Sequence, residues 1–261
     1  MTAPAPFSLL TWNINGVRAR LDAVLTYLAE REPDIVCLQE IKIEEKVFPR
    51  VPFMELGYQL QVHGSKGYAG VATLSKQKPD EVIKGFRAAP LDSHCRIINA
   101  LIGGVRVYNL YVPNGTSLGS EAFAYKLKWL ERLRVELDAS AEANQPVIVC
   151  GDFNIAPDAR DLVDPASMVG HTHFSPEEHA ALARLLEFGL RDCFRKFNDQ
   201  PAQFTWFDYR AGSFRKNLGM RLDHVYATAP LYDRCTEVVH DASPRGEEGA
   251  SDHIPVLAKF A

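Results

Sequence analysis

Short apolar runs separated by turn residues are the feature that most limits the fold of this chain. Residues 7–12, 34–40 and 146–150 are rich in apolar side chains and bounded by polar ones, which is typical of buried strands. Further strand-like segments occupy residues 58–62, 69–74, 97–102, 105–112, 204–207, 222–227, 235–239 and 254–260. Gly103-Gly104 between two of them is a hairpin signal. The pattern predicts extensive sheet with hairpin connections.

Three segments have helical patterns. Apolar residues recur on one helical face over residues 17–28, before Pro33, and again over residues 123–137. Ser175-Pro176-Glu177-Glu178 combines an N-cap, a first-turn proline and a capping-box glutamate, with Gly189 as the predicted C-cap. Many strands with few helices predict an α/β fold in which two mainly antiparallel sheets pack together between helices.

No linker-like segment interrupts the 261 residues, so we expect one domain, residues 7–261, after a flexible N-terminal tail, residues 1–6. No run of about 18 uncharged apolar residues is present, and the start lacks a signal-like pattern. These features predict a cytoplasmic protein with no membrane partner, and we expect a monomer. Five widely spaced cysteines without a CxxC pattern favour reduced, mostly buried thiols.

The charge balance excludes a uniformly basic nucleic-acid coat. The chain has 29 Lys and Arg residues and 33 Asp and Glu residues, so its net charge is −4. A polyanionic partner would therefore have to bind a local basic patch. Residues 206–221 are the best candidate because basic and aromatic side chains alternate there: Trp206, Phe207, Tyr209, Arg210, Phe214, Arg215, Lys216 and Arg221. Such residues could contact phosphates and fill the gap left by a missing base. A solvated hairpin with a core tryptophan explains the same pattern.

Polar residues capable of chemistry stand at the ends of the predicted strands. At strand exits are Asn13, Asn15, Glu40, Tyr111, Asn114, Asp152 and Asn154, and at strand entrances are Asp223, Asp252 and His253. In an antiparallel sandwich, exits of one set of strands and entrances of the other share an edge, so all of them could meet at one rim. Taken singly, each is equally well explained as an Asx turn or a solvated strand end.

Together these residues suit a metal-dependent phosphodiesterase. Carboxylate and amide oxygens, without thiolates or paired histidines, favour Mg²⁺, or Mn²⁺, over zinc. A divalent ion, a histidine with a carboxylate partner and neutral donors are what phosphodiester hydrolysis requires. A competing cluster lies in a loop that contains Pro and Gly, and we expect it to form solvated turns: Asp158, Asp161, Asp164, His171 and His173.

Seven sequence blocks resemble the exonuclease III family of abasic-site DNA-repair nucleases. They are TWNINGVRAR at 11–20, LQEIK at 38–42, YVPNG at 111–115, GDFNIAP at 151–157, TWFDYR at 205–210, RLDH at 221–224 and SDHIPV at 251–256. The blocks occur in family order and span nearly the whole chain. The resemblance implies a four-layer α/β/β/α sandwich that acts on double-stranded DNA.

The resemblance also implies roles for individual residues. The implied metal residues are Glu40, Asn15 and Asp252, and the implied catalytic residues are Asn13, Tyr111, Asp152, Asn154, Asp223 and His253. Asp152 would handle the proton of water or of the leaving group, and His253, paired with Asp223, would contact the scissile phosphate. Which of Asp152 and His253 is the base stays open.

By the same resemblance, the DNA contacts would come from Arg96, Asn114, Trp206, Arg210, Met220, Arg221 and Leu222. Trp206, Met220 and Leu222 would line the abasic-sugar pocket, where relatives often carry Trp or Leu in place of Met220. The implied activities are incision 5′ to abasic sites, 3′-to-5′ exonuclease action and cleaning of blocked 3′ ends. Two alternatives stay open: a phosphoesterase of the same superfamily acting on RNA or on a phospholipid or inositol phosphate, and a catalytically silent nucleic-acid-binding protein on the same fold.

Overall fold

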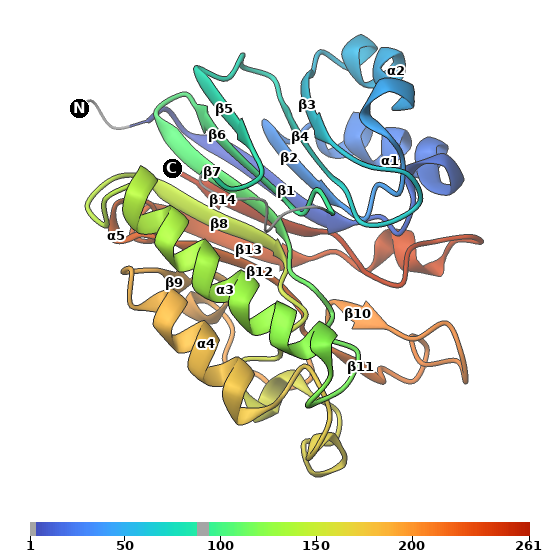
Figure 1. Cartoon of the computed structure of the whole chain (residues 1–261). Coiled ribbons are helices and arrows are strands. Elements are labelled where there is room, and N and C mark those ends of the chain that lie inside the picture. Colours follow the sequence, from blue (N-terminus) through green and yellow to red (C-terminus); the bar gives the residue numbers. More distant parts are fainter. Residues whose placement is uncertain (1–3, 88–93) are drawn as a thin grey trace.

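The computed structural model describes residues 4–87 and 94–261, which form two sheets packed face to face between helices (Figure 1). The first sheet has the strand order β13-β14-β1-β2-β4-β3. Its strands are β1 (Phe7–Asn13), β2 (Ile35–Gln39), β3 (Gln59–His63), β4 (Val71–Ser75), β13 (Cys235–His240) and β14 (Val256–Phe260). Neighbouring strands are antiparallel except for the parallel pair β1–β2.

The second sheet has the order β5-β6-β7-β8-β12-β9 and one parallel pair, β7–β8. Its strands are β5 (Glu81–Lys84), β6 (Ile97–Ile102), β7 (Val105–Tyr111), β8 (Val147–Asp152), β9 (Arg191–Asp192) and β12 (Asp223–Ala227). A separate two-stranded ribbon, β10 (Trp206–Phe207) and β11 (Gly219–Met220), projects beyond the two sheets (Figure 1).

Helices cover the outer face of each sheet (Figure 1). On the first sheet lie α1 (Val17–Arg31) and α2 (Arg50–Glu55), on the second lie α3 (Glu121–Ser140) and α4 (Pro176–Leu186), and α5 (Ala229–Tyr232) follows β12. Short 3₁₀ turns are η1 (Glu45–Val47), η2 (Ala159–Asp161), η3 (Ala166–Met168), η4 (Phe194–Lys196) and η5 (Ser243–Gly246). The predicted four-layer α/β/β/α sandwich of two mainly antiparallel sheets is confirmed.

Separate hydrophobic clusters hold the layers together. Val107 and Val225 belong to the cluster between the sheets, Leu28 joins α1 to the first sheet, and Leu133 and Leu185 join α3 and α4 to the second. All five side chains are at most 1 % exposed, and burying each contributes about 1.5–3 kcal/mol. Cys37, Cys150, Cys193 and Cys235 are also buried.

Strand register brings the polar strand ends to one edge. The parallel pair β1–β2 sets Asn13 beside Gln39, so Glu40 follows at the same end. In the second sheet, Tyr111 at the end of β7 pairs with Asp152 at the end of β8, and Asp152 pairs with Asp223 at the start of β12. Strand exits and strand entrances therefore share an edge, as the sequence analysis predicts.

Short or weakly patterned elements are where the structure departs from the sequence prediction. Neither α2, whose six residues include a proline, nor the four-residue strand β5 was predicted. Helix α4 ends at Leu186 with Glu187 as its C-cap, whereas Gly189 was predicted there. Glu187 still has helical angles, and the chain turns only at Gly189, where φ is 101°.

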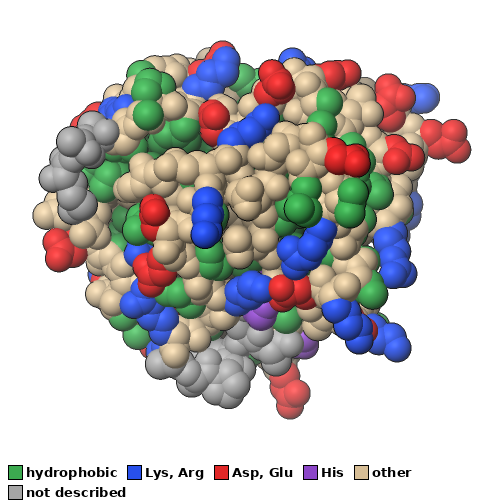
Figure 2. Space-filling view, turned by 90° about the horizontal axis from the view of Figure 1, so that it is seen from above, with side chains coloured by type: hydrophobic (Ala, Val, Ile, Leu, Met, Phe, Trp, Pro, Cys, Tyr) green, Lys and Arg blue, Asp and Glu red, His purple; other side chains and the backbone are tan. Residues whose placement is uncertain are grey.

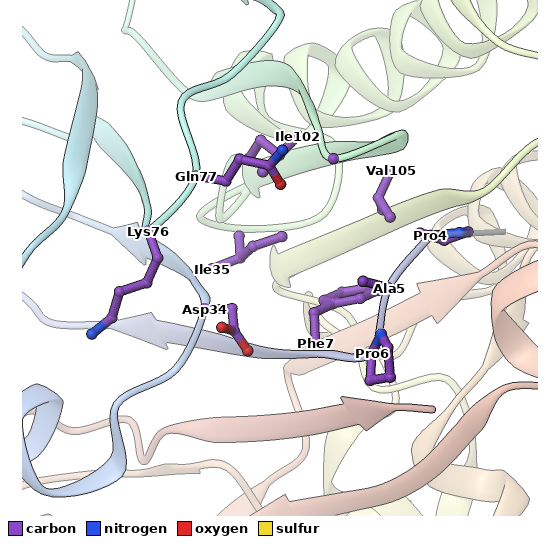
Figure 3. A pocket seen from close by; sticks show the side chains of 11 residues that line it. Pro4, Ala5, Pro6, Phe7, Asp34, Ile35, Lys76, Gln77, Ile102 and Val105 are labelled. Carbon is purple, nitrogen blue, oxygen red and sulfur yellow. The ribbon is translucent and has the colours of Figure 1, made fainter. Parts of the chain in front are cut away.

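A small cavity lies at the opposite end of the sheets from the polar edge, where β1, β2 and β7 begin (Figure 3). It has a volume of about 120 Å³, and Pro4, Ala5 and Pro6 form part of its wall. Asp34 in its lining accepts hydrogen bonds from the Ser8 N–H and Oγ–H at 2.8 and 2.7 Å, so this carboxylate links β1 to the start of β2. Residues 1–3 of the predicted tail lie outside the described residues, and the single domain of residues 7–261 stays a prediction.

The surface in Figure 2 carries Lys and Arg side chains interspersed with Asp and Glu, without a continuous field of one sign. This distribution agrees with the small net charge of −4. Among the helices that the structure describes, none has the length and apolar character needed to cross a bilayer.

Candidate active site

Three titratable side chains converge at the polar edge of the sandwich. Glu40, Asp152 and His253 each place a possible ligand atom within 4.8 Å of the other two. They open into a cavity of about 240 Å³ whose other lining residues are Tyr111, Asn114, Asn154, His173, Trp206, Met220, Leu222 and Asp252. Segments from both halves of the chain therefore contribute to one site.

The turns that follow the strands aim these side chains. Asn15, Glu40 and Asn154 come just after β1, β2 and β8, and each has a positive φ, between 47° and 51°. Such angles reverse the chain at once, and asparagine tolerates them better than most residues. The Asp152 carboxylate accepts a hydrogen bond from the Asn154 N–H at 2.9 Å, so the Asx turn proposed from the sequence forms within the site itself.

Asn13 holds the two carboxylates together. Its Nδ2 donates to Glu40 Oε1 and to Asp152 Oδ2, both at 2.9 Å, and its Oδ1 accepts from the Asn15 N–H at 3.0 Å. This side chain is fully buried, so few competing water contacts are available to it. The amide thereby fixes the separation of two like charges that would otherwise repel each other.

His253 stands between two carboxylates. Its Nδ1–H donates to Asp223 Oδ2 at 2.8 Å, and its Nε2 lies 3.7 Å from Asp152 Oδ2. Burial opposes the charged imidazolium, but the nearby carboxylates of Asp223 and Asp152 outweigh burial and raise the pKa of His253 to about 10. His253 is therefore a cation at neutral pH, paired with Asp223 as the sequence analysis expects.

Asp152 and Glu40 have opposite protonation tendencies. Burial raises the pKa of Asp152 to about 7, because loss of water around the carboxylate outweighs the attraction of His253. Burial also opposes ionisation of Glu40, but hydrogen bonds from Asn13 and Lys42 hold the pKa of Glu40 below its ordinary value. The Lys42 ammonium lies 2.7 Å from Glu40 Oε2. The site thus contains a permanent carboxylate beside one that can exchange a proton near pH 7.

Tyr111 supplies a neutral donor on the wall of the cavity. Burial, together with the charges of Glu40 and Asp152, raises the pKa of Tyr111 well above its ordinary value, so the phenol keeps its proton. The Arg96 guanidinium lies 4.6 Å from the centre of the Tyr111 ring and donates to the Tyr111 carbonyl at 3.3 Å. Arg96 is therefore close to the cavity, next to a residue that lines it.

A second hydrogen-bonded cluster, built around the single carboxylate of Asp252, borders the first. Asp252 Oδ1 accepts from Asn15 Nδ2 at 3.0 Å, and Asp252 Oδ2 accepts from the Trp206 indole N–H at 3.0 Å. Tyr209 joins this cluster because its hydroxyl accepts from Asn15 Nδ2 at 3.1 Å. Although burial opposes ionisation, His253 and these donors keep the pKa of Asp252 below its ordinary value. Asn15 therefore lies between Asp252 and Lys42, to which its Oδ1 is hydrogen-bonded.

Comparison with known proteins places this arrangement in a family. The family model described as Endonuclease/Exonuclease/phosphatase family matches residues 10–253. The chain belongs to that family. Exodeoxyribonuclease III of Haemophilus influenzae is 36 % identical to it, over 96 % of this chain and 98 % of the relative.

Solved structures of the family share the whole fold. An AP endonuclease from Archaeoglobus fulgidus has a TM-score of 0.94 at 39 % identity, covering 97 % of this chain and 99 % of its own. The 3′ phosphatase NExo from Neisseria, determined with a product DNA hairpin, also has a TM-score of 0.94, at 36 % identity over 98 % of this chain and 99 % of its own. The polar edge described above is therefore that of an Endonuclease/Exonuclease/phosphatase family member.

The carboxylates of this family member fit a hard divalent cation. Glu40 and Asp152 offer oxygen atoms with spare lone pairs beside the cavity, as Mg²⁺ and Mn²⁺ prefer, and no thiolate lies in the cluster found among the described residues. His253 is a poor ligand because an imidazolium protonated on both nitrogens has no lone pair to give. Glu40 and Asp152 are therefore the residues of this cluster that could hold such a cation.

Two expectations from the sequence analysis need correction. Arg221 was assigned to the DNA-contacting surface, but it is 1 % exposed and its Nε donates to Asp161 Oδ1 at 2.6 Å. It also donates to Asp192 Oδ2 at 2.8 Å, so its charge is used inside the protein. Asp161 is expected in a solvated turn, but it is fully buried, and its carboxylate accepts from Arg221 and Arg195. Arg210 does face solvent, with a side chain 88 % exposed beside Asp208.

His173 is a residue of the cavity that the sequence analysis set aside. Its Nδ1–H donates to the Asn154 carbonyl at 2.7 Å, and its Nε2 lies 3.4 Å from Asn114 Nδ2. Burial lowers the pKa of His173 to about 4, so it is neutral at pH 7. Its position in a Pro- and Gly-containing loop gave no sign of this contact. The only sequence signal is that His173 lies close to the capping box at residues 175–178, which indicates that the loop is followed directly by an ordered helix.

Proposed function

We propose that this chain is a Mg²⁺-dependent DNA phosphodiesterase that cleaves 5′ to abasic sites, degrades duplex DNA from 3′ ends and removes blocking groups from those ends. The observation that carries the proposal is the convergence of Glu40, Asp152 and His253 within 4.8 Å beside one cavity. Its relatives include proteins named exodeoxyribonuclease III, AP endonuclease and 3′ phosphatase, which supports DNA as the substrate.

The proposed mechanism assigns proton transfer to Asp152. With its pKa raised to about 7, Asp152 can take a proton from the attacking water and return it to the leaving oxygen. Asn13 and the Asn154 N–H hold its oxygens in place through hydrogen bonds of 2.9 Å. Asn154 also lines the cavity and would orient the water or a phosphate oxygen.

Charge on the phosphate would be met by the remaining groups. His253, kept protonated by Asp223, and the Tyr111 phenol can each donate a hydrogen bond to a phosphate oxygen. Glu40 would hold Mg²⁺, and Asn15 and Asp252 would provide a neighbouring position. When bound, the ion would neutralise negative charge on the phosphate. Trp206, Met220 and Leu222 would form the apolar wall against the sugar.

The test is cleavage of labelled duplexes with and without Mg²⁺. One duplex has a single abasic analogue, one a 3′-phosphate and one is intact, and an RNA duplex is the comparison. We expect Mg²⁺-dependent products from the DNA duplexes, loss of cleavage after chelation and recovery with Mg²⁺ or Mn²⁺. A chelator-resistant activity, or cleavage of RNA alone, would contradict the proposal.

The site assignment is tested by Glu40→Gln and Asp152→Asn. Each should lower turnover by about two to three orders of magnitude, the scale of losing an electrostatic or proton-transfer group. Asp138→Asn is the matched control, because Asp138 lies on the surface of α3 paired with Arg134. It should leave turnover unchanged. Full activity in both site variants would reject the assignment.

A further inference from the structure

A fully buried ion pair lies behind the cavity, between the outer helices and the site. Lys126 of α3 and Glu178 of α4 are both 0 % exposed, and the Lys126 ammonium donates to Glu178 Oε1. Neither residue lines the cavity. A buried ion pair adds little net stability compared with well-packed apolar residues, so this one calls for another explanation.

The ammonium of Lys126 reaches the two loops that carry site residues. It donates to the Asn154 carbonyl at 2.7 Å and to the Asn114 carbonyl at 3.2 Å. With Glu178 as the third acceptor, all three N–H groups of the ammonium are used. No apolar side chain could satisfy these two carbonyls, which belong to the turns after β7 and β8.

Glu178 fixes the third loop around the cavity. Its Oε1 accepts from the His173 N–H at 3.0 Å, and its Oε2 accepts from the Ser175 N–H and Oγ–H at 3.0 and 2.9 Å. The capping-box glutamate of α4 therefore does more than cap its helix. Its carboxylate ties the loop holding His173 to Lys126, and through Lys126 to Asn154.

The contacts meet at a residue whose backbone is under constraint. Asn154 has φ +51°, and its carbonyl accepts both from Lys126 and from the His173 Nδ1–H. Its side chain donates to the Val112 carbonyl at 3.0 Å and to Asp152 Oδ2 at 3.3 Å. The Asn154 side-chain amide contacts the Asp152 carboxylate, to which we assign proton transfer. Fixing the Asn154 carbonyl therefore also fixes this side-chain amide.

We propose that the Lys126–Glu178 pair positions Asn154 and Asn114 for the reaction, so that the two outer helices set the geometry of the phosphate side of the site. The inference rests on the proposed function, since it concerns the same reaction. Lys126 and Glu178 are positioning residues, because they act through the peptide groups of the loops. Glu40 and its cation site lie beyond these contacts and should be unaffected.

The test compares Lys126→Met and Glu178→Gln with a matched control, Glu136→Gln. Glu136 is a buried carboxylate on the same helix, 1 % exposed and held by Arg87. It lies ten residues from Lys126, about 15 Å along α3. All three variants lose a buried charged contact and should melt at a lower temperature than the wild type.

The turnover number should distinguish the Lys126 and Glu178 variants from Glu136→Gln, although the melting temperature should not. We expect Lys126→Met to lower kcat by about 30- to 100-fold on the DNA duplexes, the scale of a misplacement of about 1 Å in a site. Glu178→Gln leaves both Lys126 carbonyl contacts possible and should lower kcat less, by roughly 5- to 10-fold. KM and the Mg²⁺ concentration for half-maximal activity should change little. Glu136→Gln should keep kcat within about twofold of the wild type.

Amide hydrogen exchange gives a readout that does not need turnover. Exchange in residues 112–116 and 152–156 should accelerate in Lys126→Met and not in Glu136→Gln. If Lys126→Met does not fold, Lys126→Gln, which keeps an N–H donor, replaces it and should show the same changes to a smaller degree. Unchanged kcat in folded Lys126 and Glu178 variants, or an equal loss in Glu136→Gln, would overturn the inference while leaving the proposed function standing. A wild-type chain inactive on every DNA duplex would instead refute the proposed function, and this inference with it.

Discussion

At the scale of single residues, the site depends on a buried hydrogen bond between two charged groups. Asp223 is 1 % exposed, and its Oδ2 accepts the Nδ1–H of His253 at 2.8 Å. That contact fixes the orientation of the imidazole ring and favours its charged form. A neutral amide at this position would remove the charge that keeps the ring protonated, and the hydrogen bond that its oxygen could still accept would be weaker.

Asp223→Asn should therefore lower kcat by about one to two orders of magnitude while the protein stays folded. The Mg²⁺ requirement should not change, because Asp223 makes no contact with Glu40 in the described structure. Steady-state rates over a range of Mg²⁺ concentrations measure both quantities. Wild-type turnover in this variant would show that the orientation of His253 is unimportant.

At the scale of elements, Arg221 joins β11 and β12 to neighbouring segments. Its guanidinium binds Asp161 of η2 and Asp192 of β9, and Arg195 of η4 also pairs with Asp161. Arg221→Met leaves the buried Asp161 with Arg195 alone and the partly buried Asp192 without its guanidinium partner, which should reduce the free energy of unfolding by about 3–5 kcal/mol. Urea denaturation followed by circular dichroism measures this change.

Arg210→Ala should show the opposite behaviour. Its side chain is 88 % exposed, so the free energy of unfolding should change by less than about 0.5 kcal/mol. Because an exposed arginine in this position can meet a phosphate, the slope of log affinity for duplex DNA against log salt should fall by about 1. If Arg221→Met instead reduced the salt dependence of DNA binding and kept the free energy of unfolding, Arg221 would be the phosphate contact and its assignment as a structural residue would be wrong.

The contrast between these arginines shows what the sequence can predict. Strand ends such as Asn13, Glu40 and Asp152 could be located from local pattern, because register follows from apolar runs and hairpin turns. The partners of Arg221, Lys126 and Glu178 could not, because they come from segments far apart in the chain. The capping box gave Glu178 its place at the start of a helix, yet nothing local reveals that the same carboxylate meets Lys126.

At the scale of the whole molecule, burial keeps neutral two histidines that do not line the cavity, His224 and His240. His224 is 1 % exposed, its Nε2–H donates to the Ile155 carbonyl at 2.9 Å, and burial lowers its pKa to about 4. Burial also lowers the pKa of His240 well below its ordinary value. The unfolded chain, in which histidine titrates near 6.5, binds these protons more readily than the folded protein does.

The contribution of these two histidines to stability should therefore fall as the solution is acidified. The contribution of His224 is fully present above pH 6.5 and is lost progressively as pH falls toward 4, with a total of about 3 kcal/mol. His224→Gln keeps an N–H donor for the Ile155 carbonyl but has no proton to gain. Urea unfolding of both proteins at pH 7, 5.5 and 4.5 should show a smaller decrease for the variant, and the shared effect of the carboxylates cancels in the difference. Parallel curves for the two proteins would mean that His224 accepts its proton without opening the fold.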